Sequence, residues 1–202
     1  MRLQAVRVFV PLSIVRSLGQ SVTRELQVGG WRVVPANLAP SLFYVEERRL
    51  GLSERRAEAS LLLEHGADPN LCMNDGTSPL ICAAMAPGDA GLGAAALLLD
   101  AKADIDHPQE VGQTALQAAC ECSNVEVAKL LLERGANINL QKSEGMAALH
   151  IALQFSYVEI AKLLLERGAD KDLRDNDGDG VDYYVNAAEH SQEELRALLA
   201  RY

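Results

Sequence analysis

The chain repeats one phrase four times, and this repetition constrains its fold more than any other feature. The copies begin 36, 33 and 33 residues apart, and they read LLLEHGADPN at 61–70, LLLDAKADID at 97–106, LLLERGANIN at 130–139 and LLLERGADKD at 163–172. A second phrase keeps the same spacing, with glycines at 76, 112, 145 and 178. A period of this length indicates a supersecondary unit stacked on copies of itself, because one unit alone buries too little apolar surface.

The second phrase identifies the kind of unit. It reads DGTSPLICAA at 75–84, VGQTALQAAC at 111–120 and EGMAALHIAL at 144–153. With the 33-residue period, these segments resemble the T-P-L-H-x-A core of the ankyrin-repeat family. The resemblance covers roughly residues 56–202. It implies an all-α solenoid of stacked helix-turn-helix units connected by β-hairpin loops. First helices are predicted at 79–85, 115–122 and 148–155, and a second helix at 126–134.

The repeats also predict how the chain is divided. We expect residues 1–52 to form a basic N-terminal segment, either poorly ordered or a degenerate cap, and residues 53–202 to form the repeat domain. The expected units are 53–73 (partial), 74–108, 109–141, 142–175 and a C-terminal cap at 176–202. Residues 1–24 carry four Arg and no acidic residue, which leaves organellar targeting open. Alternation in VRVFV and WRVV indicates short strands, so a small β element stays open as well, as does an incorrect gene start.

Three departures from the repeat pattern indicate local differences between the units, at Lys102, Ala147-Ala148 and Asp182. Lys102 stands where glycine ends the helix in the other copies, and a left-handed lysine costs about 1–2 kcal/mol. Ala147-Ala148 replaces Thr-Pro, so that helix loses an N-cap worth about 1 kcal/mol. His150 is interpreted as structural, because no nucleophile or second base accompanies it. The last unit has Asp182 in place of a core leucine, which suits a cap with a solvated outer face.

Composition excludes several classes of function. Residues 1–56 carry nine Arg and four Glu, whereas residues 57–202 carry ten basic and 24 acidic residues. An acidic body repels phosphate backbones, so no nucleic-acid partner is expected. Apolar runs reach only about eight residues, too short to cross a membrane. The four cysteines form no CxxC pair and are interpreted as reduced thiols of a cytoplasmic, or alternatively nuclear, protein. No phosphate loop or nucleophile elbow is present, so we expect neither enzyme activity nor a cofactor.

An aspartate cluster near the C-terminus suggests an alternative function. Asp175, Asp177 and Asp179 followed by Gly180 look like the opening of a calcium loop. The alternative is therefore a weakly calcium-binding or calcium-regulated protein acting through Asp175–Asn186. A tight site is not expected, since position 12 of the loop is Asn186 rather than a bidentate Glu. Repeats accessory to an enzyme in another chain are a further alternative.

The resemblance implies a non-enzymatic protein-interaction module or adaptor, with no metal site, that binds through its concave face. In this family the contact surface is usually the hairpin tips and the exposed inner side of the first helix. The matching residues are Asn74, Asp75, Thr77, Met85, Glu110, Val111, Gln113, Glu121, Ser143, Glu144, Met146, Gln154, Phe155, Asp177 and Asp179.

Apolar residues in this set are the candidate anchors. Val111, Met146 and Phe155 are apolar at positions expected to be exposed; packing of Phe155 against a neighbouring repeat is the alternative. We expect Gln113 beside Met146, and Cys122 beside Phe155. The expected partner of this monomer is a protein segment with apolar anchors between basic residues.

Overall fold

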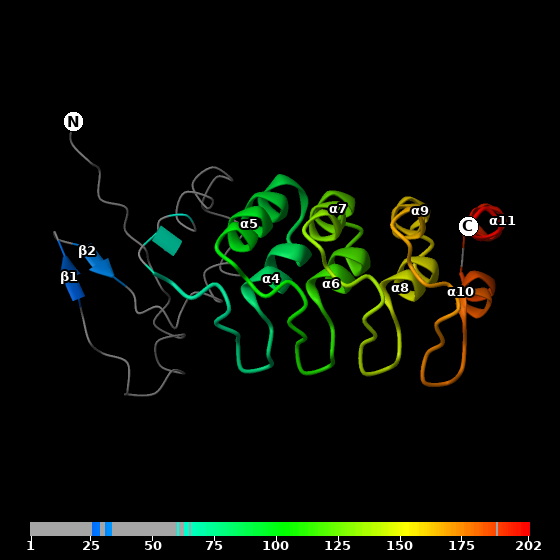
Figure 1. Cartoon of the computed structure of the whole chain (residues 1–202), viewed down its shortest axis with the longest axis horizontal. Coiled ribbons are helices and arrows are strands. Elements are labelled where there is room, and N and C mark those ends of the chain that lie inside the picture. The colour runs from blue at the N-terminus through cyan, green and yellow to red at the C-terminus, as the bar shows by residue number, and fades with distance from the viewer. Residues whose placement is uncertain (1–25, 29–30, 34–59, 61–62, 65, 189) are drawn as a thin grey trace.

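The computed structural model describes residues 26–28, 31–33, 60, 63–64, 66–188 and 190–202. Eight named helices lie in these ranges and form four pairs. The pairs are α4 (Pro79–Met85) with α5 (Gly88–Asp100), α6 (Ala115–Glu121) with α7 (Val125–Glu133), α8 (Ala148–Gln154) with α9 (Val158–Glu166), and α10 (Val181–Ala187) with α11 (Gln192–Leu199). Figure 1 shows the pairs stacked along one axis, with the connecting loops projecting to one side. The predicted all-α solenoid is confirmed.

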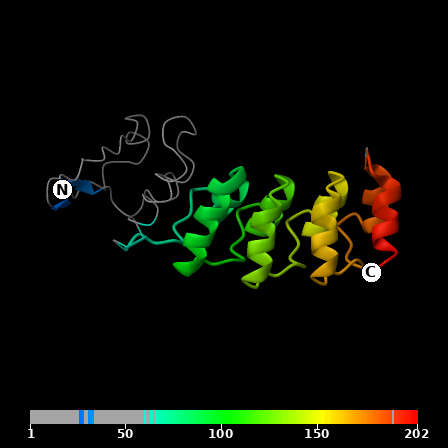
Figure 2. The ribbon, with the colours of Figure 1, turned by 90° about the horizontal axis from the view of Figure 1, so that it is seen from above.

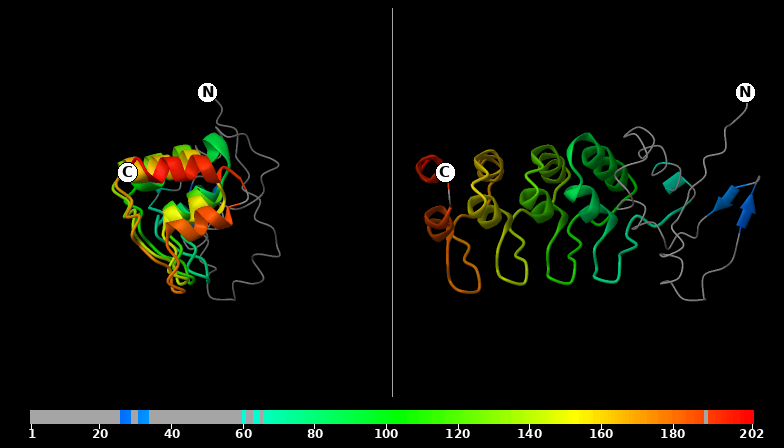
Figure 3. Two further views of the ribbon diagram at one scale, coloured as in Figure 1. Left: turned by 90° about the vertical axis from the view of Figure 1, so that its right-hand side faces the viewer. Right: turned by 180° about the vertical axis from the view of Figure 1, so that it is seen from behind.

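The helices form two layers. An inner layer contains α4, α6, α8 and α10, and an outer layer contains α5, α7, α9 and α11; each helix contacts its pair mate and its neighbours in the same layer. Figure 2 shows the outer helices lying nearly parallel. In the end-on view of Figure 3 the helices of each layer overlap one another, with the outer layer above the inner layer and the loops below both. This regularity follows from the 33-residue period, because equivalent residues make equivalent contacts.

Small and aliphatic side chains explain how closely the layers pack. The inner helices contribute buried alanines such as Ala84 and Ala119, whose small size lets the outer helices approach. Each of the outer helices α5, α7 and α9 contributes one fully buried leucine at the same register position, namely Leu98, Leu131 and Leu164. The core is therefore continuous along the stack rather than divided between repeats.

The first full repeat accommodates its extra residues by lengthening a helix. Helix α5 has 13 residues, whereas the equivalent α7 has nine. Gly91 lies in the first turns of α5 against the end of α4, where an added Cβ would come within 2.3 Å of the Ala86 carbonyl oxygen. At the other end of α5, Lys102 has φ +70°, while Gly135 has φ +92° at the equivalent position. The left-handed conformation predicted for Lys102 is confirmed.

The loops between repeats are tight turns with few backbone hydrogen bonds between their two arms. Gln109 N–H donates to the Gln113 carbonyl (3.0 Å), and Gly112 N–H to the Gln109 carbonyl (2.7 Å). Between residues 66 and 188 the structure contains one isolated bridge, Gln141 with Ala147, and no named strand. The predicted β-hairpin loops therefore take the form of single turns closed by a few backbone hydrogen bonds.

One short β-hairpin lies ahead of the repeats. Strands β1 (Leu26–Val28) and β2 (Trp31–Val33) pair antiparallel, with Val28 opposite Trp31, so the strand predicted at WRVV is present. The strand predicted at VRVFV, the segment 1–24 and the boundary at residue 52 lie outside the described residues.

The C-terminal unit keeps the helical pair but exposes more of its inner helix to solvent. Leu195 and Leu198 of α11 are buried, whereas Asp182 and Tyr183 of α10 are exposed. This agrees with the interpretation of Asp182 as a residue of a solvated cap.

Candidate functional site

The four hairpin tips form one continuous row. The second, third and fourth tips each donate a backbone hydrogen bond to the tip before it: Glu110 N–H to the Asp75 carbonyl (3.0 Å), Ser143 N–H to the Val111 carbonyl (2.9 Å) and Asn176 N–H to the Glu144 carbonyl (3.1 Å). The tips approach so closely that a Cβ on Gly145 would lie 2.5 Å from the Asn176 nitrogen. Glycine at this position is therefore required by the neighbouring backbone as well as by its positive φ.

Side-chain hydrogen bonds between the segments that lead into the tips fix the same spacing between neighbouring repeats. Asn70 Oδ1 accepts from Asp104 N–H (2.7 Å), Asp106 Oδ1 from Asn137 N–H (3.0 Å), and Asn139 Oδ1 from Asp170 N–H (2.9 Å). Each bond joins a loop to the next, so the row of tips is held from two sides and presents a preorganised surface.

Each tip carries one exposed carboxylate. These are Asp75, Glu110, Glu144 and Asp177. The Thr77 amide donates to Asp75 Oδ1 (3.0 Å) and holds the pKa of its carboxyl below the usual value. The four carboxylates give the row of tips an acidic surface, which attracts a cationic partner.

The structure places most of the predicted contact residues at the surface. Those exposed are Asn74, Asp75, Met85, Glu110, Val111, Ser143, Glu144, Gln154, Phe155 and Asp177. Glu121 and Asp179 are half-buried. Three others are buried: Thr77, Gln113 and Met146 have exposures of 8%, 8% and 7%.

The expectation that Met146 is an exposed anchor is wrong. Its side chain belongs to the continuous core. The residue after the tip glycine points into the stack in the first three repeats, because Thr77 and Gln113 at the same register position are buried as well. An apolar residue is normal at such a position and needs no partner.

Two of the three candidate anchors, Val111 and Phe155, are exposed, and so is the apolar contact residue Met85. Val111 is 54% exposed at the second tip, Met85 is 46% exposed as the last residue of α4, and Phe155 is 48% exposed just after α8. Phe155 stacks on Tyr157 of its own repeat, with ring centroids 5.7 Å apart, so one face of the ring is covered. Cys122, the equivalent residue after α6, is also exposed.

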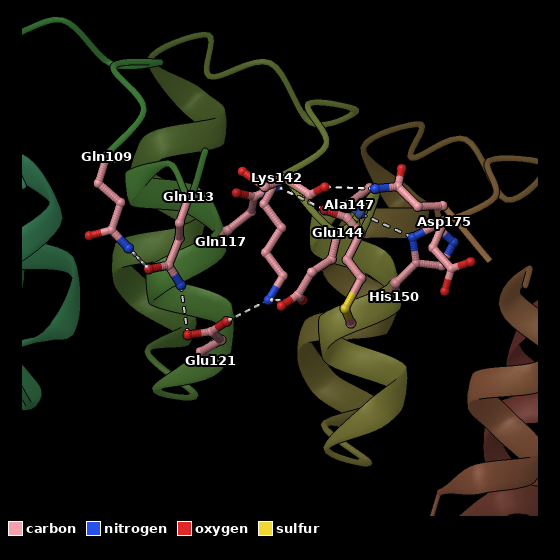
Figure 4. A network of polar contacts seen from close by, with 12 residues as sticks. Gln109, Gln113, Gln117, Glu121, Lys142, Glu144, Ala147, His150 and Asp175 are labelled. Atoms are coloured by element: carbon pink, nitrogen blue, oxygen red, sulfur yellow. Dashed lines mark hydrogen bonds and ion pairs between the residues drawn. The ribbon is translucent and has the colours of Figure 1, made fainter. Parts of the chain in front are cut away.

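A chain of polar side chains runs beneath the tips across three repeats. The Thr77 hydroxyl donates to Gln109 Oε1 (3.0 Å), Gln109 Nε2 to Gln113 Oε1 (2.6 Å), and Gln113 Nε2 to Glu121 Oε2 (2.6 Å). Figure 4 shows Gln109, Gln113 and Glu121 with Lys142, whose ammonium lies between Glu121 and Glu144. Lys142 Nζ is 3.7 Å from Glu121 Oε1 and 2.9 Å from Glu144 Oε2.

Sequence reasoning identified both glutamates as surface residues but missed their shared counterion. A signal was present in the register: the positions equivalent to Lys142 hold Met73, Gln109 and Asp175, so this is the one basic residue at that position. The repeat pattern alone does not show that its side chain reaches Glu121.

The aspartate loop is organised by hydrogen bonds inside the hairpin. Asp175 Oδ1 accepts from the amides of Asp177 (3.0 Å) and Asp179 (2.8 Å), and Oδ2 accepts from the Tyr184 hydroxyl. These donors lower the pKa of the Asp175 carboxyl, with Tyr184 as the largest cause. Within the described residues no group of three His, Cys, Asp or Glu side chains is arranged to hold a metal ion. The geometry of the loop gives the calcium alternative no support.

The structure brings together one cysteine and one histidine that the sequence did not predict to be neighbours. Cys72 Sγ lies 3.1 Å from His107 Nε2, across two neighbouring loops. Burial and the nearby Asp68 and Asp104 raise the pKa of the Cys72 thiol. Burial also raises the pKa of Cys82 to about 11 and that of Cys120 further. These thiols stay protonated at neutral pH, and a thiol is a poor nucleophile and a poor metal ligand.

Two comparisons bear on identity. A family model described as ankyrin repeats, in three copies, matches residues 88–175. A search of curated proteins finds no match to this chain.

In the part of the chain that the structure describes, no helix is both long enough and apolar enough to cross a membrane.

Proposed function

Because the chain belongs to the ankyrin-repeat family, matched over residues 88–175, we propose that it is a non-enzymatic adaptor that binds a partner segment on its hairpin face. We define the hairpin face as the four tips together with the exposed ends of α4, α6 and α8. Ankyrin repeats generally bind other proteins, and the family is typically non-enzymatic. The proposed partner segment carries apolar anchors between basic residues.

The observation that carries this proposal is one exposed carboxylate on every tip, together with exposed apolar side chains on the same hairpin face. Val111 stands among the carboxylates at the second tip, and Phe155 and Met85 lie at the far ends of inner helices. Exposed apolar anchors supply most of the affinity in such interfaces, whereas charges set rate and selectivity. The tips need no rearrangement before binding, since hydrogen bonds between loops already hold them.

Location and assembly are part of the same proposal. We place the protein in the cytoplasm or nucleus as a monomer. Support comes from Cys72, Cys82, Cys120 and Cys122, which are all free. Unpaired cysteines with protonated thiols suit a reducing compartment.

Affinity capture with the full chain, followed by measurement on the purified partner, tests the proposal. The variants are Val111→Ala and Phe155→Ala, and the matched control is Tyr202→Ala, because Tyr202 is a similarly exposed apolar residue (44%) at the end of the chain. Each of the first two changes should weaken binding by about 1–2 kcal/mol, and the control should not. If all three variants bind the partner as wild type does, the contact surface lies elsewhere.

A further inference from the structure

Lys142 differs from every other charged group on the hairpin face because it lies between two carboxylates of that face. Its side chain is 17% exposed, compared with 34% for Glu121 and 70% for Glu144. The half-buried Glu121 receives a hydrogen bond from Gln113 on its other oxygen. Lys142 therefore occupies the place that a partner's cation would take between the two carboxylates. Ion pairs that are partly buried, as these are, are screened by salt less than exposed pairs.

The other tip carboxylates have no such internal counterion. Within the described residues, no ion pair involves Asp75, Glu110 or Asp177. The hairpin face therefore divides into an open acidic end at the first two tips, a partly neutralised centre at the third tip, and a second acidic end at the fourth. Val111 lies at the second tip, next to the partly neutralised centre, and offers an uncharged apolar contact there.

We propose that Lys142 determines partner specificity by occupying the central carboxylates, so that the hairpin face selects a segment with two separated basic groups and an uncharged apolar middle. This inference rests on the proposed function and specifies the partner of the same face. Stacked helices lie about 8–10 Å apart, which puts Asp75 and Asp177 about 24–30 Å apart over three steps. An extended chain rises about 3.3 Å per residue, so the two basic groups are separated by about eight residues.

Two synthetic peptides of identical composition test this inference on the full chain. The split peptide has an arginine pair at each end of an uncharged stretch of about eight residues containing one leucine, a length set by the strand rise. The clustered peptide has the same arginines together in its middle. Wild type should bind the split peptide more tightly, by about threefold or more, which is the range of an exposed or half-buried ion pair.

Removing Lys142 should weaken or abolish that preference. Lys142→Met frees Glu121 and Glu144 together, so its affinity for the clustered peptide should rise by about threefold or more. Lys129→Met is the matched control, because it changes the net charge equally at an exposed position of α7 and should leave the ratio of the two affinities unchanged. Lys142→Gln, which keeps a polar side chain, provides the second variant if Lys142→Met proves unstable.

Each outcome separates this inference from the proposed function. If wild type prefers the split peptide and both Lys142 variants keep the wild-type ratio, the role of Lys142 is overturned and the hairpin face stands. If Lys129→Met shifts the ratio as much as Lys142→Met does, the effect is net charge, and the role of Lys142 is again overturned. Failure of both peptides to bind wild type and all variants overturns the acidic hairpin face itself, and this inference with it.

Discussion

The second and third repeats solve the same structural problem with different side chains. In the second, Gln117 Oε1 accepts from Thr114 N–H at the start of α6 (3.0 Å), and Nε2 donates to the Leu140 carbonyl of the next loop (2.8 Å). In the third, His150 Nδ1 accepts from Ala147 N–H at the start of α8 (3.0 Å), and Nε2 donates to the Leu173 carbonyl (3.1 Å). Both side chains are 1% exposed.

The comparison shows what the stack requires and what it leaves free. A buried side chain at this position must accept from its own helix start and donate to the following loop, because both backbone groups are otherwise unpaired. An amide and a neutral imidazole meet this requirement equally well. They differ in that only the imidazole titrates. The junction that His150 makes between its helix and the following loop is therefore sensitive to acid, whereas the equivalent junction made by Gln117 is not.

The largest expected effect comes from removing either side chain. His150→Leu and Gln117→Leu each leave a buried amide and a half-buried carbonyl without this partner, so each should lower the free energy of unfolding by about 2–4 kcal/mol. Denaturant unfolding of the full chain measures this. His150→Gln is the control and should keep most of the wild-type stability. The comparison fails if Gln117→Leu costs little while His150→Leu costs much, since the two positions would then not be equivalent.

A smaller effect is expected at the ends of the outer helices. Lys102 and Gly135 hold the same left-handed position, with φ +70° and +92°. Lys102→Gly should raise the free energy of unfolding by about 1 kcal/mol, because glycine adopts this conformation without steric strain. The matched change Gly135→Lys should lower it by a similar amount. An unchanged midpoint in both variants would show that the loop relaxes around either residue.

The smallest effect is a trend with pH that should separate the two junctions. Burial lowers the pKa of His150 below its ordinary value of 6.5. The unfolded chain therefore takes up a proton near that pH which the folded chain does not, and stability falls as the pH drops below 6.5. In His150→Gln this part of the loss should disappear. The lowered pKa of Asp175 acts below its ordinary 3.8, so a profile from pH 8 to about 5 isolates the histidine.

These junctions also show how far the sequence predicts the structure. Repetition predicts the helices, the left-handed Lys102 and the exposed tips, because each depends on local residue type and register. It does not predict that Met146 is buried, since its side-chain direction is set by the neighbouring repeat. Nor does it predict that Lys142 reaches Glu121, because that contact joins residues 21 positions apart in different repeats.

The central claim is that the hairpin face, rather than the outer helices, holds the partner. Hydrogen exchange of the full chain with and without the purified partner tests it most directly. We expect slower exchange on binding in 74–86, 110–122 and 143–155, which contain three of the tips and the inner helices α4, α6 and α8. Protection confined to α7 and α9, with no change at the tips, would contradict it.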